Sequence, residues 1–246
     1  MEKNIVEMQN IKKTFGNVEA LRGVNLYLKE GEVLGLVGDN AAGKSTLTKI
    51  LAGAIEPTDG DIILNGEKVV FKNPADAKSK KIEMVYQDLA LCDSIDVSGN
   101  IFLGREKILK ILGIKFLKKK EMQKETKEIL DDLAIKVKSV SSKVEFLSGG
   151  QRQSIAIGKA VASNPKVLIM DEPTSALAVA EVESVLNLIN KVKSLKVSVI
   201  LITHRLQDIF KVCDRIMVLY EGRNVAERKI NETDLSEIVS LIVAEH

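Results

Sequence analysis

The chain of 246 residues contains no tryptophan, and aromatic residues make up only 4% of it. Because 45% of the residues are nonetheless hydrophobic, the sequence predicts a core of aliphatic side chains. No apolar run approaches the roughly 20 residues that a helix needs to cross a bilayer. The first residues, MEKN, show no apolar segment of a secretory signal. The length suits one large α/β domain or one domain with inserted subdomains.

Cysteine and excess charge are also scarce. The two cysteines, Cys92 and Cys213, do not have the spacing of a metal site, which favours two reduced thiols in a cytosolic protein. Lys and Arg number 36 and Asp and Glu 34, so the net charge is +2. This balance argues against a protein built mainly to hold nucleic acid.

A glycine-rich loop with the pattern G-x-x-x-x-G-K-S follows an apolar run and precedes a helical pattern. Glycines let the backbone wrap a phosphate, and the free N–H groups of the next helix point at the anion. We interpret the loop as a nucleotide site in which Lys44 reaches the β- and γ-phosphates and Ser45 holds Mg²⁺. The alternative is a plain glycine turn before a helix. The phosphate loop, residues 38–46, consists of Gly38, Asp39, Asn40, Ala41, Ala42, Gly43, Lys44, Ser45 and Thr46.

Two carboxylates, Asp171 and Glu172, follow the buried strand predicted over residues 167–170. The carboxyl end of a core strand is where α/β sheets bind ligands. Asp171 is suited to hold Mg²⁺, and Glu172 to accept a proton from the water that attacks the γ-phosphate. The alternative is a strand end that caps the start of a helix.

A second glycine pair lies in the run Leu-Ser-Gly-Gly-Gln of residues 147–151. Ser148, Gly149, Gly150 and Gln151 stand at a predicted helix start, which favours a second anion site. Such a site would serve a nucleotide held by another copy of the chain. The alternative is a helix cap by Ser148 alone.

Three single residues are weaker candidates. His204 follows a strand and is suited to hydrogen-bond a phosphate oxygen or to orient a base, although a lone histidine is often structural. Gln87, just past another strand, is suited to ligate Mg²⁺ or position water, or is an ordinary loop residue. Phe15 is suited to stack on a nucleotide base, or is a core residue.

Strands alternate with helical patterns at both ends of the chain, which predicts a largely parallel sheet. Residues 13–16 read as a turn. Residues 88–145 read as helical. Within them, the apolar and basic stretch 108–120 is either a membrane-contacting segment or a packed connector with solvated lysines, and we favour the connector because Gly113 would break a long amphipathic helix.

In this order, the motifs resemble those of the ATP-binding cassette (ABC) ATPases over nearly the whole chain. The resemblance implies that Phe15 stacks on adenine and that the phosphate loop is Walker A. It further implies that Gln87 is the Q-loop glutamine, that residues 147–151 are the signature motif, that residues 167–172 are Walker B, and that His204 is the switch histidine.

The resemblance implies an α/β fold of the P-loop NTPase (RecA-like) type, with a largely parallel sheet, an antiparallel β subdomain and an inserted α-helical subdomain. Within one nucleotide-binding domain of residues 1–246, residues 1–87 and 160–246 would form the β-rich core and residues 88–159 the helical subdomain.

The implied ligands are ATP and Mg²⁺, and the implied assembly is a head-to-tail dimer of cassettes with two ATP molecules between them. The dimer would drive integral membrane permease subunits from the cytoplasmic face of the inner membrane, with an external solute-binding protein and no nucleic acid. Residues 100–106 and the region after His204 resemble bacterial importers of monosaccharides such as ribose or xylose, which often fuse two cassettes in one chain.

One departure from the family concerns residues 175–178, Ser-Ala-Leu-Ala, where many ABC proteins have aspartate in place of Ala178. The missing carboxylate removes a contact expected across the dimer. Two rival functions remain open at this point: a non-transport ABC ATPase acting on ribosomes or nucleic acid, and a cassette that binds ATP only to regulate. The presence of Glu172 and His204 argues against the second.

Overall fold

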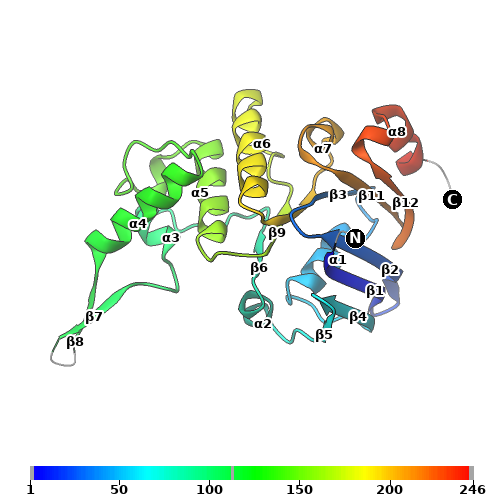
Figure 1. The fold of residues 1–246 in the computed structure, drawn as a ribbon, viewed down its shortest axis with the longest axis horizontal. Helices are drawn as coiled ribbons and strands as arrows, with labels where there is room; N and C mark the ends of the chain where they lie inside the picture. Colours follow the sequence, from blue (N-terminus) through cyan, green and yellow to red (C-terminus); the bar gives the residue numbers. More distant parts are fainter. Residues whose placement is uncertain (1–2, 112–113, 244–246) are drawn as a thin grey trace. The chain divides into compact units, whose positions relative to one another are not determined.

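The computed structural model describes residues 3–111 and 114–243. The chain divides into two compact units, whose elements are labelled in Figure 1. The first unit comprises Met1–Gln87, Pro165–Ser175 and Lys193–His246, and the second Asp88–Asn164 and Ala176–Val192. The helical subdomain predicted over residues 88–159 thus lies within the second unit.

A six-stranded sheet forms the centre of the first unit, in the order β12-β11-β3-β10-β9-β6. Every neighbouring pair is parallel except β11 with β12, so the predicted largely parallel sheet is confirmed. Strands β3, β9 and β10 are aliphatic and buried almost throughout, as expected for strands covered on both faces. The strands are β3 (Val33–Gly38), β6 (Ile82–Val85), β9 (Val167–Asp171), β10 (Ser198–Ile202), β11 (Arg215–Tyr220) and β12 (Arg223–Lys229).

A four-stranded antiparallel sheet, in the order β2-β1-β4-β5, completes the strands of this unit. The turn predicted at residues 13–16 is wrong in extent, because strand pairing continues to Phe15, opposite Val18. The chain reverses only at Gly16, whose φ of 57° suits glycine. The strands are β1 (Asn4–Phe15), β2 (Val18–Lys29), β4 (Asp59–Leu64) and β5 (Glu67–Val69).

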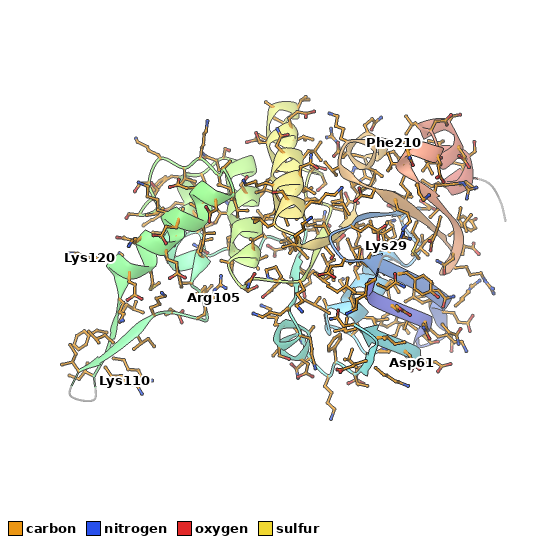
Figure 2. All side chains as sticks on the ribbon, viewed as in Figure 1. Lys29, Asp61, Arg105, Lys110, Lys120 and Phe210 are labelled. Carbon is orange, nitrogen blue, oxygen red and sulfur yellow. The ribbon has the colours of Figure 1, made fainter. Side chains whose placement is uncertain are left out.

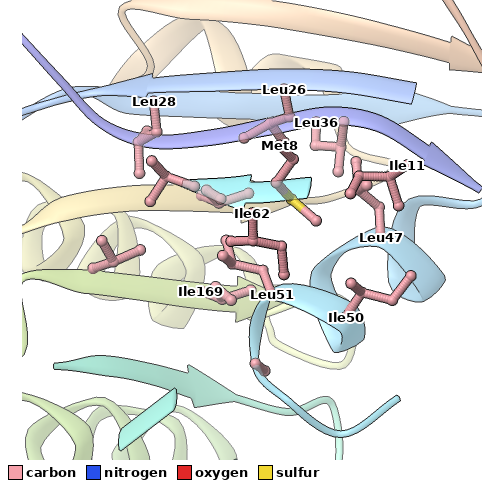
Figure 3. Close-up of a cluster of buried hydrophobic side chains, with 14 of the residues drawn as sticks. Met8, Ile11, Leu26, Leu28, Leu36, Leu47, Ile50, Leu51, Ile62 and Ile169 are labelled. Carbon is pink, nitrogen blue, oxygen red and sulfur yellow. The ribbon is translucent and has the colours of Figure 1, made fainter. Parts of the chain in front are cut away.

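Helix α1 (Lys44–Leu51) contributes to one core with both sheets of this unit. Figure 3 shows Leu47, Ile50 and Leu51 of the helix beside Met8 of β1 and Ile169 of β9. The predicted aliphatic core is confirmed, since Phe71 is the one aromatic side chain of this cluster among the described residues. The packing fixes the helix that begins at the phosphate loop. The other helices of the unit are α2 (Pro74–Ser79), α7 (Leu206–Val212), the 3₁₀ turn η2 (Ile230–Glu232) and α8 (Leu235–Val243).

The second unit is mainly helical, and α3 contacts both α4 and α5. Two residues of the stretch 100–106, which resembles the sequences of sugar importers, have structural roles in this unit. The Asn100 amide bonds both backbone groups of Cys92, at 2.7 and 2.9 Å, and Arg105 bonds the carbonyls of Ile101 and Lys159. The helices are α3 (Val97–Ile101), α4 (Lys119–Asp132), the 3₁₀ turn η1 (Val144–Phe146), α5 (Gly149–Val161) and α6 (Val179–Ser194), whose last two residues belong to the first unit.

The helical prediction for residues 88–145 is wrong over 88–96 and 134–143, which are not helical, and where strands β7 (Ile108–Ile111) and β8 (Ile114–Leu117) form an antiparallel hairpin. The packed connector that we favoured is also wrong, because every residue of both strands is exposed. The isoleucine and phenylalanine residues of these segments favour strands. The proposed helix breaker, Gly113, lies outside the described residues. Nowhere in the described chain is a helix both long enough and apolar enough to cross a membrane.

Candidate functional site

The phosphate loop joins β3 to α1 and depends on two glycines whose φ angles are positive. Gly38 has a φ of 145°, and a Cβ atom there would lie 2.1 Å from the Leu219 carbonyl oxygen. Gly43 has a φ of 94°, and its Cβ would lie 2.7 Å from the Ala20 carbonyl oxygen. As the N-cap of α1, Gly43 offers no side chain to the first N–H groups of the helix. These donors are therefore left for an anion.

Lys44 lies folded against the loop that carries it. Its Nζ donates to the carbonyl oxygens of Gly38 at 2.9 Å and Asp39 at 2.7 Å. Burial lowers the pKa of Lys44, while the charges of Glu172, Asp39 and Asp171 oppose that shift. The Lys44 ammonium thus donates to two backbone carbonyls inside the loop. It can replace one of these hydrogen bonds by a stronger one to a charged phosphate oxygen.

The loop and the histidine predicted from sequence line one cavity of about 240 Å³. Gly38, Asp39 and Asn40 form one wall, His204 another, and Val239 of α8 a third. The parallel sheet explains this proximity, because the carboxyl ends of β3 and β10 are adjacent in its strand order. The structure thus brings the phosphate loop and His204 together.

Asp171 ends β9 and faces α1. The Ser45 hydroxyl interacts with its carboxylate by a hydrogen bond, which joins the two residues predicted to hold Mg²⁺. Burial raises the pKa of Asp171, and the neighbouring Glu172 charge raises it further, so a nearby cation would be stabilising. Within residues 3–111 and 114–243 no three His, Cys, Asp or Glu side chains form a metal cage. The donor set fits Mg²⁺, which usually combines one or two carboxylates with substrate phosphates and water.

Glu172 occupies a strained backbone position next to the histidine. Its φ is 54°, uncommon for a residue with a side chain, and its N–H donates to the Ile202 carbonyl at 2.9 Å. Its Oε2 lies 2.6 Å from Nδ1 of His204, and the glutamate side chain is 17% exposed against 61% for the histidine. Strain of this kind concentrates at functional sites. The contact is a close approach of charged or polar groups and not an aligned hydrogen bond, because Glu172 Oε2 is buried without a hydrogen-bond partner among the described residues. A buried carboxylate oxygen with an unused lone pair beside a histidine is suited to act as a base.

A buried hydrogen bond connects the segments that carry Glu172 and His204. Thr174, two residues after Glu172, donates its hydroxyl to Asp208 of α7 at 2.7 Å. Arg205 lies 3.3 Å from the same carboxylate. Because Thr174 follows β9 and Asp208 follows His204, this bond fixes the two segments relative to each other. The sequence analysis did not identify Asp208. The signal that could have identified it is its position on the same helix face as the apolar residues Ile209 and Val212.

Gln87 and Phe15 belong to the same unit as the phosphate loop, Asp171, Glu172 and His204. Gln87 is exposed two residues beyond β6, whose Val85 pairs with Met170 of β9. Phe15 is 47% exposed, so the alternative of a core residue is wrong. Its strand partner Val18 is 66% exposed, and sequence reasoning missed this second apolar side chain. The two offer an apolar surface for a base.

The signature motif lies in the second unit, at the beginning of α5. Ser148 caps the helix: its Oγ accepts from the Gln151 N–H at 3.3 Å, and the Gln151 Oε1 accepts from the Ser148 N–H at 3.1 Å. The helix starts at Gly149, two residues earlier than predicted. Gln151 also donates to the Lys136 carbonyl, so its side chain shapes the motif from within.

A carboxylate from α6 contacts this motif, which the sequence did not reveal. Glu181 Oε1 accepts from the Gly150 N–H at 3.0 Å, Oε2 accepts from the Ala178 N–H at 3.3 Å, and the Ser148 hydroxyl also bonds it. These bonds lower the pKa of Glu181. Its side chain lies so close that a Cβ on Gly150 would be 2.7 Å from the Glu181 Cβ. The Glu181 carboxylate therefore already uses two donors of the signature motif, the Gly150 N–H and the Ser148 hydroxyl.

The family model described as ABC transporter matches residues 21–175 of the chain. The chain is 44% identical to the xylose/arabinose import ATP-binding protein of Sulfolobus acidocaldarius over 241 residues, which cover 98% of this chain and 94% of that protein. It is 39% identical to the ribose import ATP-binding protein of Bacillus subtilis over 97% of this chain but only 48% of that protein. The chain therefore spans nearly all of one relative and about half of the other.

Solved structures of cassettes have the same fold. A nucleotide-free ATP-binding cassette from an ABC transporter superimposes with a TM-score of 0.84 at 26% identity, over 98% of this chain and all of that one. A dimeric cassette in a post-hydrolysis state, bound to ADP and Pi, gives a TM-score of 0.76 at 28% identity, over 92% of this chain and 98% of that one.

Proposed function

This chain belongs to the ABC transporter family, and on that premise we propose that it is the ATP-hydrolysing subunit of a monosaccharide importer. The observation that carries the proposal is the placement of His204, 2.6 Å from Glu172, in one cavity with Gly38, Asp39 and Asn40 of the phosphate loop. The names of both import relatives support the choice of a sugar, with a pentose as the first candidate.

Hydrolysis follows from the placement of these groups. The phosphate loop binds the ATP phosphates through the first N–H groups of α1 and through Lys44, which gives up a loop carbonyl for the anion. Glu172 accepts a proton from the attacking water, while His204 orients the carboxylate and donates to the γ-phosphate. The Phe15 and Val18 surface holds the base, and Gln87 positions water.

Mg²⁺ would be held by Ser45 and Asp171. Gln87 would be a third ligand, because it lies at the same edge of the sheet. Such an ion neutralises charge on the β- and γ-phosphate oxygens when it is bound. The raised pKa of Asp171 supports this assignment, because a cation would offset both its burial and the charge of Glu172.

The working unit is a homodimer in which the signature motif of one copy meets the ATP of the other. The signature residues proposed to contact that ATP are Ser148, Gly149, Gly150 and Gln151, and the dimeric cassette structure supports the assembly. Closure on ATP and opening after hydrolysis would move permease subunits at the cytoplasmic face of the membrane.

The proposal is tested by purifying the tagged chain from native membranes in mild detergent and identifying the co-purified proteins by mass. We expect a multi-span membrane protein and an exported solute-binding protein, which is then screened against ribose, xylose and arabinose. Ribosomal proteins or nucleic acid without a membrane partner would refute transport and favour the non-transport ATPase.

Glu181 predicts a specific behaviour of this dimer. Its carboxylate uses the Gly150 N–H and the Ser148 hydroxyl, which the partner's γ-phosphate would need. Two anions cannot share these donors without repulsion, so ATP has to displace Glu181 on closure. In a Glu172→Gln background, Glu181→Ala should lower the ATP concentration for half-maximal dimerisation about tenfold, since a hydrogen bond to a charged group contributes roughly 1.5 kcal/mol or more. Analytical ultracentrifugation measures this.

Glu183→Ala, on the same helix, is the matched control and should leave the ATP requirement unchanged. Glu181→Gln keeps the length of the side chain without its charge, and should shift the requirement in the same direction. If both Glu181 variants need more ATP than the parent, the carboxylate supports the signature motif rather than competing for it.

A further inference from the structure

The hairpin of β7 and β8 has one face made only of apolar side chains. Ile108 pairs with Leu117, Leu109 with Phe116, Lys110 with Lys115 and Ile111 with Ile114. Because side chains alternate across a strand, one face carries four apolar side chains and the other two apolar side chains and two lysines. The wholly apolar face consists of Leu109, Ile111, Ile114 and Phe116, each 45–60% exposed.

A two-stranded hairpin is marginally stable in water by itself, so an apolar face left in solvent indicates a missing partner surface. Figure 1 shows the hairpin extending from the N-terminal end of α4, beyond the helices of its own unit. Its apolar residues are therefore available to a surface outside the chain.

Charge identifies the partner surface. No acidic residue occurs between positions 107 and 120, which include six lysines. Lys107, Lys118 and Lys119 form ion pairs with acidic residues of the same unit. Lys110, Lys115 and Lys120 form none among the described residues, and Figure 2 shows Lys110 on the hairpin and Lys120 at the start of α4.

Lys110 and Lys115 stand directly opposite each other, and like charges in that position destabilise a hairpin. A surface of negative charge would remove this repulsion. Protein interfaces are depleted in lysine and enriched in aromatic residues, methionine and arginine, whereas the hairpin carries lysines and a single aromatic residue. A plane of anionic lipid headgroups fits better, since the long lysine side chains of the opposite face can extend to the headgroups while the apolar face is inserted.

We propose that the β7–β8 hairpin is a membrane-surface anchor that inserts Leu109, Ile111, Ile114 and Phe116 at the headgroup boundary and places Lys110 and Lys115 among anionic headgroups. The anchor is separate from the nucleotide site and would act without ATP. It would keep the cassette at the bilayer while its dimer opens.

The test is sedimentation of the nucleotide-free chain with vesicles of 30% phosphatidylserine in phosphatidylcholine and with pure phosphatidylcholine vesicles. We expect binding to the anionic vesicles that weakens with salt. Each lysine near such a surface contributes about fivefold, so Lys110→Gln with Lys115→Gln should reduce binding about 25-fold. Leu109→Ser with Phe116→Ser should reduce it at least as much.

Matched controls use exposed residues elsewhere: Lys72→Gln with Lys80→Gln for charge, and Val70→Ser with Val179→Ser for apolar surface. They should bind like the parent, and all variants should hydrolyse ATP at the parent rate. Absence of vesicle binding by the parent, or equal binding by the hairpin variants, would overturn the anchor. So would hairpin variants that bind vesicles normally but no longer co-purify with a membrane protein, since the hairpin would then be a protein-docking element.

Discussion

Replacing Glu172 with glutamine is expected to reduce ATP hydrolysis by about 1,000-fold while ATP binding remains. A positioned general base contributes roughly 10² to 10⁴ in rate, and Glu172 is the carboxylate that lies 2.6 Å from the histidine beside the phosphate loop. The amide cannot accept the proton from water, but it keeps the size and shape of the side chain. Single-turnover hydrolysis and binding of a fluorescent ATP analogue measure the two effects separately.

The same variant should accumulate as a dimer in ATP, because closure occurs but hydrolysis does not reopen it. Gel filtration with and without ATP measures this state. Glu67→Gln, an exposed glutamate of β5, is the control and should hydrolyse ATP at the parent rate. Parent-level turnover by the Glu172 variant would mean that another group is the base.

Replacing Lys44 with alanine is expected to weaken ATP binding by at least about 30-fold. The ammonium is buried against its own loop and surrounded by three carboxylates, so its removal leaves negative charge facing the phosphates. Loss of one partner from a buried charged pair costs about 2–5 kcal/mol, which corresponds to 30-fold or more in affinity. Calorimetric titration with a non-hydrolysable ATP analogue measures it.

Lys44→Arg tests whether charge alone is sufficient. The planar guanidinium is too large for the space between the Gly38 and Asp39 carbonyls, so we expect it to restore little of the affinity. Lys80→Ala, on the exposed end of α2, is the matched control. ATP affinity unchanged by Lys44→Ala would exclude the phosphate loop as the site and would leave the family's fold without its usual ligand.

The two experiments also separate binding from chemistry in the proposed cycle. Lys44 acts before closure and Glu172 after it, so only the Glu172 variant should form the ATP-bound dimer. This difference makes the Glu172→Gln chain the background in which the Glu181 prediction can be measured without turnover.

The sequence by itself determined the local parts of the site. The spacing of Gly38, Gly43 and Lys44 between an apolar run and a helical pattern predicts the loop, because only glycine fits the positive φ angles found there. The aliphatic composition likewise predicts the core, and the alternation of strands and helices predicts a parallel sheet. Each of these depends on neighbours within one element or its flanks, where residue type and spacing act directly.

The tertiary structure alone decided which distant groups meet. The Glu172–His204 pair and the Thr174–Asp208 bond depend on β9 and β10 being neighbours, which periodicity does not encode. The contact of Glu181 with the signature motif also depends on tertiary structure, because it requires the start of α6 to lie beside the start of α5. In strands β7 and β8, residue type did not predict whether the side chains are buried. The apolar residues of β7 and β8 suggested a packed connector, yet all of them are exposed, because burial is a property of the surrounding structure and not of the side chain.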